Sequence, residues 1–351
     1  MTPRLSDANR LGLDYAAEAA SFPYTGPIID LHTHVSSPEA AAVFLDAAER
    51  FGVVKTWTMT GLEKARRVRG FAGDKIEFIC VPDYAKRDEP GTFTTQWLKD
   101  IEAFRTELGS RIIKFWAAPR GLDVAAGPDS PLRLDSPIRL EGMKLAYDLG
   151  YRIFMTHVGD PDTWFATTYA DAAKYGTKPD QFIALERLMD QYDDVTWIGA
   201  HLSGSPENLD FVQGLLDRHP NYLVDTSATK WMVRELSKHP QRFATFCEAN
   251  PGRVLFGTDI VANDENVTRQ DDDDPHKPDG YDLYASRFWA LRTLLETDYD
   301  GPSPIVDPDL RLIDPSADPK STATLRGCGM RGNLLDDIYY RNAANLMGLV
   351  E

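Results

Sequence analysis

The fold prediction starts from Ile28-Ile29-Asp30-Leu31-His32-Thr33-His34, where an apolar run leads into a His-x-His pair. Side chains two apart in an extended strand point to the same face, so His32 and His34 can direct two imidazoles at one point. Imidazole is a ligand suited to zinc, copper, iron and nickel. The stretch therefore predicts a buried strand that ends at a metal. Two unrelated histidines at a strand end are the alternative.

Seven further short apolar runs follow, and segments of helical period lie between most of them. The eight predicted strands are 28–34, 53–58, 76–81, 111–116, 152–157, 195–201, 222–226 and 254–259. The predicted helices between them are 38–51, 94–108, 137–149, 181–192, 206–219 and 233–249. Alternating strands and helices predict an α/β fold, a (β/α)8 TIM-type barrel with a parallel sheet. A doubly wound open sheet is the competing fold, but no glycine-rich phosphate loop follows the first strand.

The chain is expected to form a single barrel domain over residues 1–351, with its strands within about 28–259. Three connections, 117–136, 158–180 and 260–280, are long for loops that follow strands. Such loops build the active site of a barrel, so they are expected to form a lid and a substrate wall. Helices 281–296 and 334–346 form a predicted C-terminal extension, separated by the irregular stretch 298–331, for which a disordered insertion is the alternative. The acidic run 271–274 is expected to be a solvated loop.

Charge and composition narrow the function classes. The net charge of −16 argues against a nucleic-acid or anionic-membrane partner, because either would require a basic face. The three cysteines are widely spaced and form no C-x-x-C, which is typical of thiols in a reducing compartment. Residues 1–22 lack an apolar signal-peptide core, and no apolar run reaches membrane-spanning length. A cytoplasmic location is therefore expected.

Polar side chains fall at the ends of the predicted strands. All are expected at the carboxyl rim, where barrel enzymes place their catalytic groups. Any one histidine is better explained by a packing role, but the recurrence of the pattern favours a functional cluster. These residues are His32, His34, Lys114, His157, His201 and Asp259.

In this pattern the chain resembles the amidohydrolase superfamily, in particular the amidohydrolase-related branch that includes aminocarboxymuconate-semialdehyde decarboxylase. The resemblance runs from Asp30-Leu31-His32-Thr33-His34 to the terminal motif at 339–346. Its intermediate landmarks are Met155-Thr156-His157, Trp197-Ile198-Gly199-Ala200-His201 and Leu255-Phe256-Gly257-Thr258-Asp259. It implies a distorted (β/α)8 barrel, a divalent metal that is usually zinc, a small-molecule substrate and a homodimer.

The resemblance also implies roles for individual residues. The implied ligands of one metal are His32, His34, His157 and Asp259, with water in an open position. Asp259 would also accept a proton from that water. His201 would act beside the metal as a general acid or base, or as a donor to developing negative charge.

Lys114 has three interpretations. Binuclear members of the superfamily carry a carboxylated lysine on the matching strand, so Lys114 and His201 could bind a second metal. A substrate-binding ammonium and a structural ion pair are the alternatives. Weaker candidates for substrate contact are Arg120, which could bind a carboxylate, and Trp116 and Trp164, which could line an aromatic pocket.

Hydrolysis of a small molecule by metal-activated water is the favoured function. Non-oxidative decarboxylation of a small unsaturated or aromatic acid is the alternative, since it needs the same cluster. The related decarboxylase usually has Pro-Trp after the strand-five histidine, whereas Val158-Gly159 follows His157 here, which favours hydrolysis. A non-catalytic metal-binding barrel is a third class, which the retained His201 and Asp259 disfavour.

Overall fold

A computed structural model describes residues 5–125, 130–267 and 277–349. The chain divides into two compact units. Unit 1 comprises Met1–Trp57, Gly70–Ile76 and Thr226–Glu351, and unit 2 comprises Thr58–Arg69 and Glu77–Asp225.

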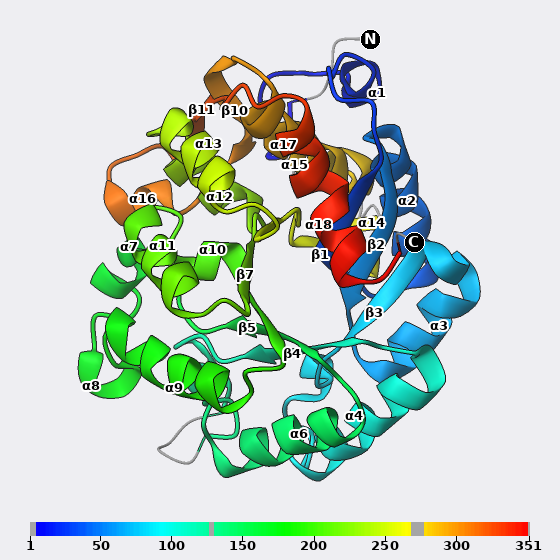
Figure 1. The fold of residues 1–351 in the computed structure, drawn as a ribbon. Helices are drawn as coiled ribbons and strands as arrows, with labels where there is room; N and C mark the ends of the chain where they lie inside the picture. Colours follow the sequence, from blue (N-terminus) through cyan, green and yellow to red (C-terminus); the bar gives the residue numbers. More distant parts are fainter. Residues whose placement is uncertain (1–4, 126–129, 268–276, 350–351) are drawn as a thin grey trace. The chain divides into compact units, whose positions relative to one another are not determined.

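Unit 2 is built on parallel strands that are hydrogen-bonded in chain order (Figure 1). These strands are β3 (Ile76–Cys80), β4 (Ile112–Trp116), β5 (Ile153–His157), β6 (Thr196–Gly199) and β7 (Tyr222–Asp225). A helix connects each strand to the next, as a parallel arrangement requires. Helix α3 (Leu62–Ala72) begins in unit 2 and ends in unit 1. The other helices of unit 2 are α4 (Thr95–Leu108), α5 (Gly121–Val124), α6 (Pro137–Asp148), α7 (Asp162–Ala166), α8 (Ala172–Tyr175), α9 (Lys178–Gln191), α10 (Ala200–Gly204) and α11 (Leu209–Arg218), with a 3-10 turn, η2, at Tyr84–Lys86.

Helix α11 illustrates how the sequence sets these elements. The Asn208 side chain accepts a hydrogen bond from the Phe211 N–H at the first turn, which begins the helix. The buried positions Leu209, Val212 and Leu216 recur at helical spacing. Burial of this apolar stripe stabilises the helix against the sheet, since short helices are marginal on propensity alone.

Unit 1 contains β1 (Ile28–Val35), which pairs in parallel with β9 (Ile260–Ala262) in the register Thr33 to Ile260. The other elements of the unit are α1 (Tyr15–Ala19), α2 (Pro38–Arg50), η1 (Gly73–Lys75), β8 (Val254–Leu255), α12 (Thr229–Leu236), α13 (Pro240–Ala249), α14 (Asp264–Val267), α15 (Gly280–Glu296), β10 (Asp300–Val306), α16 (Leu310–Ile313), β11 (Thr322–Arg326), α17 (Asn333–Asp336), η3 (Asp337–Arg341) and α18 (Asn342–Leu346). Strand β2 (Val53–Met59) begins in unit 1 and ends in unit 2.

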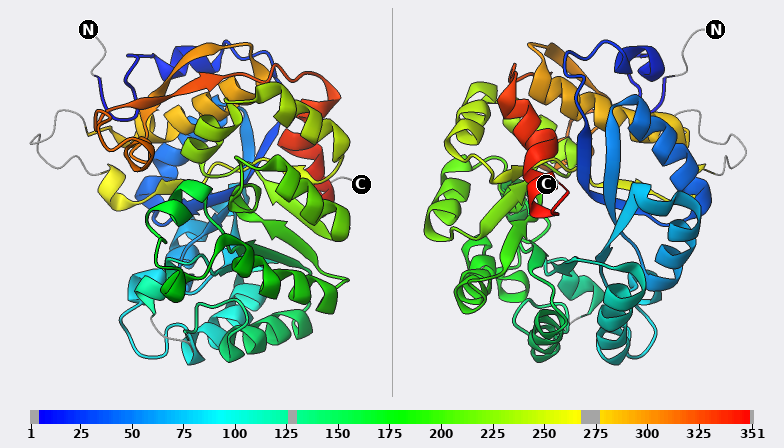
Figure 2. Two further views of the ribbon diagram at one scale, coloured as in Figure 1. Left: turned by 90° about the vertical axis from the view of Figure 1, so that its left-hand side faces the viewer. Right: turned by 45° about the vertical axis from the view of Figure 1, so that its right-hand side comes forward.

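Strands β10 and β11 form an antiparallel hairpin next to the N-terminal segment of unit 1 (Figure 2). Two backbone hydrogen bonds join β10 to this N-terminal segment: Arg10 N–H donates to the Pro304 carbonyl at 2.8 Å, and Val306 N–H donates to the Asp7 carbonyl at 2.9 Å. The stretch 298–331 was expected to be irregular, so the hairpin corrects that prediction. Its many prolines and aspartates hid two strands, because Pro is tolerated on edge strands.

Parallel strands alternate with helices along the chain, and the fold is that of the (β/α)8 barrel. The predicted fold class is confirmed. The predicted first strand, 28–34, and the predicted helix 38–51 each end within one residue of β1 and α2.

Several predicted boundaries are wrong. The sixth predicted strand, 195–201, ends at Gly199, and the eighth, 254–259, contains only the two residues of β8. The predicted helix 233–249 is two helices, α12 and α13, because Pro240 starts a new helix at its first position. Helix α3 was not predicted at all, since its Arg- and Lys-rich sequence obscures the buried positions Leu62, Ala65 and Val68.

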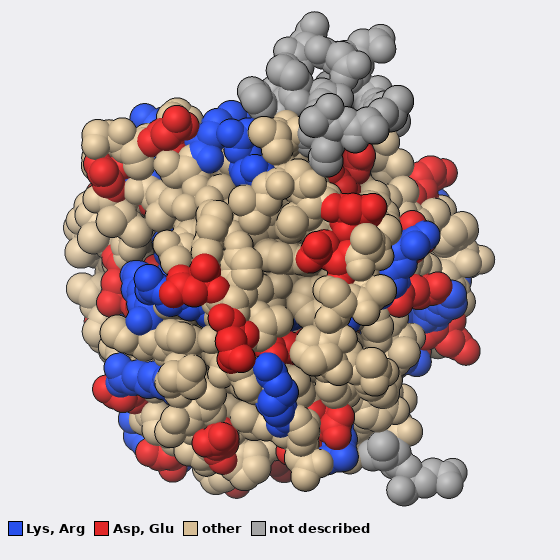
Figure 3. Space-filling view, turned by 90° about the horizontal axis from the view of Figure 1, so that it is seen from above, with Lys and Arg blue, Asp and Glu red and all other residues tan. Residues whose placement is uncertain are grey.

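No helix in the described ranges combines the length and apolar character needed to cross a membrane. Acidic and basic side chains intermingle on the face of the molecule drawn in Figure 3. The acidic run 271–274, predicted to be a solvated loop, lies outside the described residues.

Candidate metal centre and proton-transfer residues

Strand β1 presents both of its histidines on one side. The ring centroids of His32 and His34 are 6.0 Å apart, as expected for positions two apart in a strand. The His32 side chain is fully buried, whereas that of His34 is 36% exposed. One imidazole therefore lies in the protein interior and the other reaches solvent.

Asp259 joins these histidines from the turn between β8 and β9. Its N–H donates to the His32 carbonyl at 2.7 Å, and its φ of 59° is left-handed, a conformation that Asp tolerates better than most residues. The Asp259 Oδ1 atom lies 3.4 Å from His32 Nε2 and 3.1 Å from His34 Nε2. Gly257 permits this close approach, because a Cβ there would lie 2.8 Å from the His32 Cβ.

Buried hydroxyl and carboxylate groups hold this triad of His32, His34 and Asp259. Ser227 Oγ is hydrogen-bonded to His32 Nδ1 at 3.0 Å. Asp30, itself fully buried, accepts hydrogen bonds from the Thr258 hydroxyl at 2.7 Å and from the N–H groups of Thr258 and His32. These contacts fix the end of β1 against the turn that carries Asp259.

The triad has the donor set of a divalent-metal site. Ligand atoms of His32, His34 and Asp259 all lie within 4.8 Å of one another. Two imidazole nitrogens and a carboxylate oxygen are a common protein donor set for zinc. When Nδ1 of His32 carries the proton and donates it to Ser227 Oγ, Nε2 presents its lone pair to the cation.

In unit 2, His157 and His201 lie together. Their ring centroids are 4.5 Å apart with the rings nearly perpendicular. His157 ends β5, as predicted, and its Nε2 lies 2.7 Å from Asp160 Oδ1. Tyr169 donates its hydroxyl proton to the other oxygen of Asp160 at 2.6 Å, and burial followed by the Asp160 charge raises the pKa of Tyr169. Asp160 therefore orients the His157 ring and is held in turn by Tyr169.

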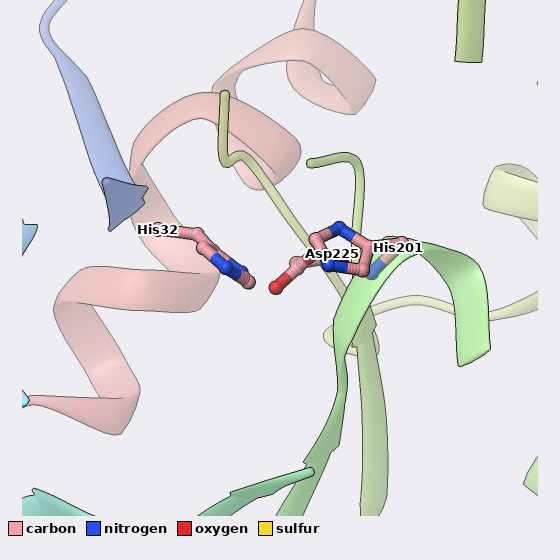
Figure 4. A group of neighbouring side chains, drawn as sticks. All are labelled: His32, His201 and Asp225. Atoms are coloured by element: carbon pink, nitrogen blue, oxygen red, sulfur yellow. Dashed lines mark hydrogen bonds between the residues drawn. The ribbon is translucent and has the colours of Figure 1, made fainter. Parts of the chain in front are cut away.

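His201 does not close a strand, contrary to prediction. It lies two residues after β6 in the short turn of α10, where His201, Leu202 and Ser203 all have left-handed backbone angles. Its N–H donates to Asp225 Oδ1 at 2.8 Å, so the carboxylate at the end of β7 fixes this turn. Figure 4 draws the buried His201 imidazole and the Asp225 carboxylate.

The remaining candidates of unit 2 lie on or after β4. Lys114 is buried within β4, in register with Met155 of β5. The Arg120 guanidinium lies 6.0 Å from the centre of the Trp164 ring, so these two weak candidates contact each other. Trp116 packs edge-on against Tyr84 at 5.5 Å.

A cavity of about 280 Å³ is lined by Ala117, Pro119 and Gly121, which adjoin Trp116 and Arg120 in the chain, and none of the four candidates lines it. Two of the three long connections that were expected to form a lid and a substrate wall contribute to it: 117–136 through Ala118 and Leu132, and 158–180 through Val158 and Tyr175. Residues 126–129 of the first connection lie outside the described ranges.

Sequence reasoning missed the supporting residues of the site. Ser227 and Thr258 contact residues about 200 or more positions away in the chain, at His32 and Asp30. No spacing rule relates such residues. The contact of Asp160 with His157 could have been predicted from the sequence, because Asp160 follows His157 by only three residues in a loop.

Comparison with known proteins gives a family and two distant structural relatives. A family model described as amidohydrolase matches residues 29–286. An amidohydrolase 2 from Bifidobacterium longum subsp. infantis is 16% identical, with 67% of this chain and 84% of that chain covered and a TM-score of 0.39. The 5-carboxyvanillate decarboxylase of Sphingomonas paucimobilis is 12% identical, with 74% and 92% covered and a TM-score of 0.40. No curated protein matches the sequence.

Proposed function

Because the chain belongs to the amidohydrolase family, we propose that it is a metal-dependent hydrolase that attacks a small-molecule substrate with metal-activated water. The observation that carries this proposal is the triad of His32, His34 and Asp259, in which both Nε2 atoms lie within 3.4 Å of one carboxylate oxygen. The metal is proposed to be zinc, which suits nitrogen and oxygen donors in a site that keeps a position open for water.

In this proposal His32, His34 and Asp259 hold the cation, which lowers the pKa of bound water and polarises a substrate carbonyl. The Asp259 side chain is 28% exposed, so its carboxylate can be reached by water as well as by the histidines. It is proposed to accept the proton of the attacking water. The Ser227 hydroxyl keeps the His32 ring in the orientation that this requires.

The roles in unit 2 are carried over from the family. His157 is proposed as a further ligand through Nδ1, since its Nε2 faces the Asp160 carboxylate. The His201 imidazole is proposed to donate the proton to the leaving group. Its ring packs against His157, and its backbone N–H is held by Asp225. Lys114 is proposed to bind an acidic substrate group or, when carboxylated, a second metal.

Metal content per chain, measured by elemental analysis of protein purified without chelators, tests the ligand set. About one zinc is expected for the wild type, and the variant His32→Ala/His34→Ala should lose it. His201→Asn should keep the metal and lose turnover. Two metals per chain, with one lost in His201→Asn, would instead make His201 a ligand. Full metal retention in the double variant would refute the site.

Turnover on a panel of amides, lactones and small unsaturated or aromatic acids tests the reaction type. The proposal expects release of a carboxylic acid from an amide or lactone. Release of carbon dioxide from an acid, with no hydrolysis, would establish the decarboxylase alternative and refute hydrolysis. Both reactions would be lost with the metal, so His34→Ala separates either one from contaminating activity.

A further inference from the structure

Two basic side chains of unit 1 interact electrostatically and have no acidic partner in direct contact among the described residues. Lys230 is on α12 and Arg287 is on α15, and these two helices pack against each other. Both side chains are partly buried. Among the residues that the structure describes, neither forms an ion pair, and Lys230 makes no hydrogen bond.

The hydrogen bonds of Arg287 leave one edge of its guanidinium available. Nη1 donates to the Leu283 carbonyl at 2.9 Å and to Ser286 Oγ at 2.8 Å, both on the same helix. Nε and Nη2 donate to no described residue. The Nε–Nη2 edge is a fork that matches the two oxygens of a carboxylate or phosphate. The hydrogen bonds of Nη1 fix the guanidinium on α15, and its Nε–Nη2 edge has no hydrogen-bond acceptor among the described residues.

The three carboxylates whose charges act on Lys230 are hydrogen-bonded to other donors. Asp307 is bound by Arg234 at 2.6 Å, and Asp7 by Lys320 at 2.7 Å. Asp309 accepts from Trp231 Nε1 at 2.9 Å. These three aspartates moderate the positive field around Lys230 but do not neutralise it through contact.

The titration behaviour of the two cations agrees with this arrangement. Burial, and then the nearby Arg287 charge, lower the pKa of Lys230 to about 8, against the opposing effect of Asp307, Asp309 and Asp7. Burial lowers the pKa of Arg287 to about 10. Partly buried like charges are costly unless an anion pairs with them.

We propose that Lys230 and Arg287 form a binding site for a small oxyanion, a carboxylate or a phosphate group. The ammonium would bind the anion as a point charge, and the Arg287 fork would bind two of its oxygens. None of these atoms belongs to the proposed metal ligands, so the site can be tested whether or not the proposed hydrolase activity is correct.

The position of Lys230 connects this site to the metal triad of the same unit. The preceding residue, Thr229, donates its hydroxyl proton to the Thr258 carbonyl at 3.1 Å, next to Asp259. Ser227, three residues before Lys230, is hydrogen-bonded to His32. An anion at Lys230 therefore lies one short segment away from the groups that support the triad.

Titration of the metal-loaded chain with sulfate, inorganic phosphate and acetate tests the site, by calorimetry at constant ionic strength in chloride. Because hydrogen bonds to charged groups are the stronger ones, Lys230→Gln and Arg287→Gln should each weaken anion binding by about tenfold or more. Lys230→Arg keeps the charge and should retain most of the binding. Phosphate or sulfate binding well above that of acetate identifies a phosphate-type ligand, and equal or tighter acetate binding identifies a carboxylate.

Two cations that do have acidic partners provide matched controls. Lys238→Gln removes a charge paired with Glu235, and Arg326→Gln one paired with Asp300, and both should leave anion binding unchanged. The proposal is overturned if none of the three anions binds, or if Lys230→Gln and Arg287→Gln bind them like the wild type. If Arg287→Gln fails to fold, Lys230→Gln decides alone.

The pH dependence gives a second readout. Binding needs the protonated Lys230, so affinity should be full well below pH 8 and should fall as pH rises through about 8. Lys230→Arg should remove this fall, since arginine keeps its proton. The same fall with pH in Lys230→Arg would overturn the role of Lys230.

Discussion

Both ring nitrogens of His32 face polar partners, and the contribution of one partner, the Ser227 hydroxyl, to metal binding can be tested. Ser227 Oγ is 3.0 Å from Nδ1, while Nε2 faces Asp259. Loss of such an outer hydrogen bond typically weakens metal binding by about 10–100-fold, because the ring loses its tautomer and orientation. We therefore expect Ser227→Ala to weaken zinc binding to this extent, measured by competition with a chromogenic chelator.

A buried serine elsewhere in the chain is the control for this substitution. Ser110 is buried and donates its hydroxyl proton to backbone carbonyls of Phe78 and Ile112. Ser110→Ala should cost stability without changing zinc affinity. Equal zinc affinities in Ser227→Ala and the wild type would show that Ser227 does not orient a ligand.

At the residue scale, the sequence predicted which side chains lie together better than it predicted their backbone conformations. His32 and His34 lie together because a strand places residues two apart on one face, and that rule can be read directly from the sequence. Asp259 and His201 were predicted to end strands, but both have left-handed backbone angles in turns. Ser227 contacts His32, which lies 195 residues earlier in the chain, and no local sequence pattern relates the two residues.

The segment that leads into α12 supports the metal triad through Ser227 and Thr229, and it contains a strained residue, Ala228. Ala228 has a φ of 64° between Ser227, which contacts His32, and Thr229, which contacts Thr258. A left-handed angle costs an L-residue roughly 1–2 kcal/mol, while glycine costs about 0.5–1 kcal/mol in chain entropy. We expect Ala228→Gly to raise the free energy of unfolding by about 0.5 kcal/mol, from urea denaturation.

The same substitution in a regular helix should act in the opposite direction. Ala103 is in the interior of α4, and Ala103→Gly should lower the free energy of unfolding by about 1 kcal/mol. A loss of similar size in both variants would mean that the angle at Ala228 is not strained. Unchanged zinc binding in Ala228→Gly would also show that the supporting contacts survive.

Elements with strong periodicity and clear end signals were predicted accurately. β1 and α2 fall within one residue of their predicted ends, since an apolar run and a Ser-Pro start mark them. α3 has only three buried positions among charged residues, so its period was not visible. The hairpin of β10 and β11 depends on pairing across a long loop, which composition alone does not show.

At the scale of the whole molecule, a metal in the triad would connect distant parts of unit 1. His32 and His34 come from the first strand, and Asp259 follows more than 220 residues later. A ligand that binds only the folded chain stabilises it by mass action. The metal should therefore act as a structural crosslink as well as a source of chemistry.

We expect removal of the metal by dialysis against a chelator to lower Tm, and zinc to restore it. Free zinc at 100 times its Kd should contribute about 2.7 kcal/mol, which corresponds to a shift of several degrees. His34→Ala should abolish the zinc-dependent shift, because it removes one of the three triad ligands. His239→Ala changes an exposed histidine of the same unit and should preserve it. A zinc-dependent shift that survives in His34→Ala would place the stabilising metal at ligands other than the triad.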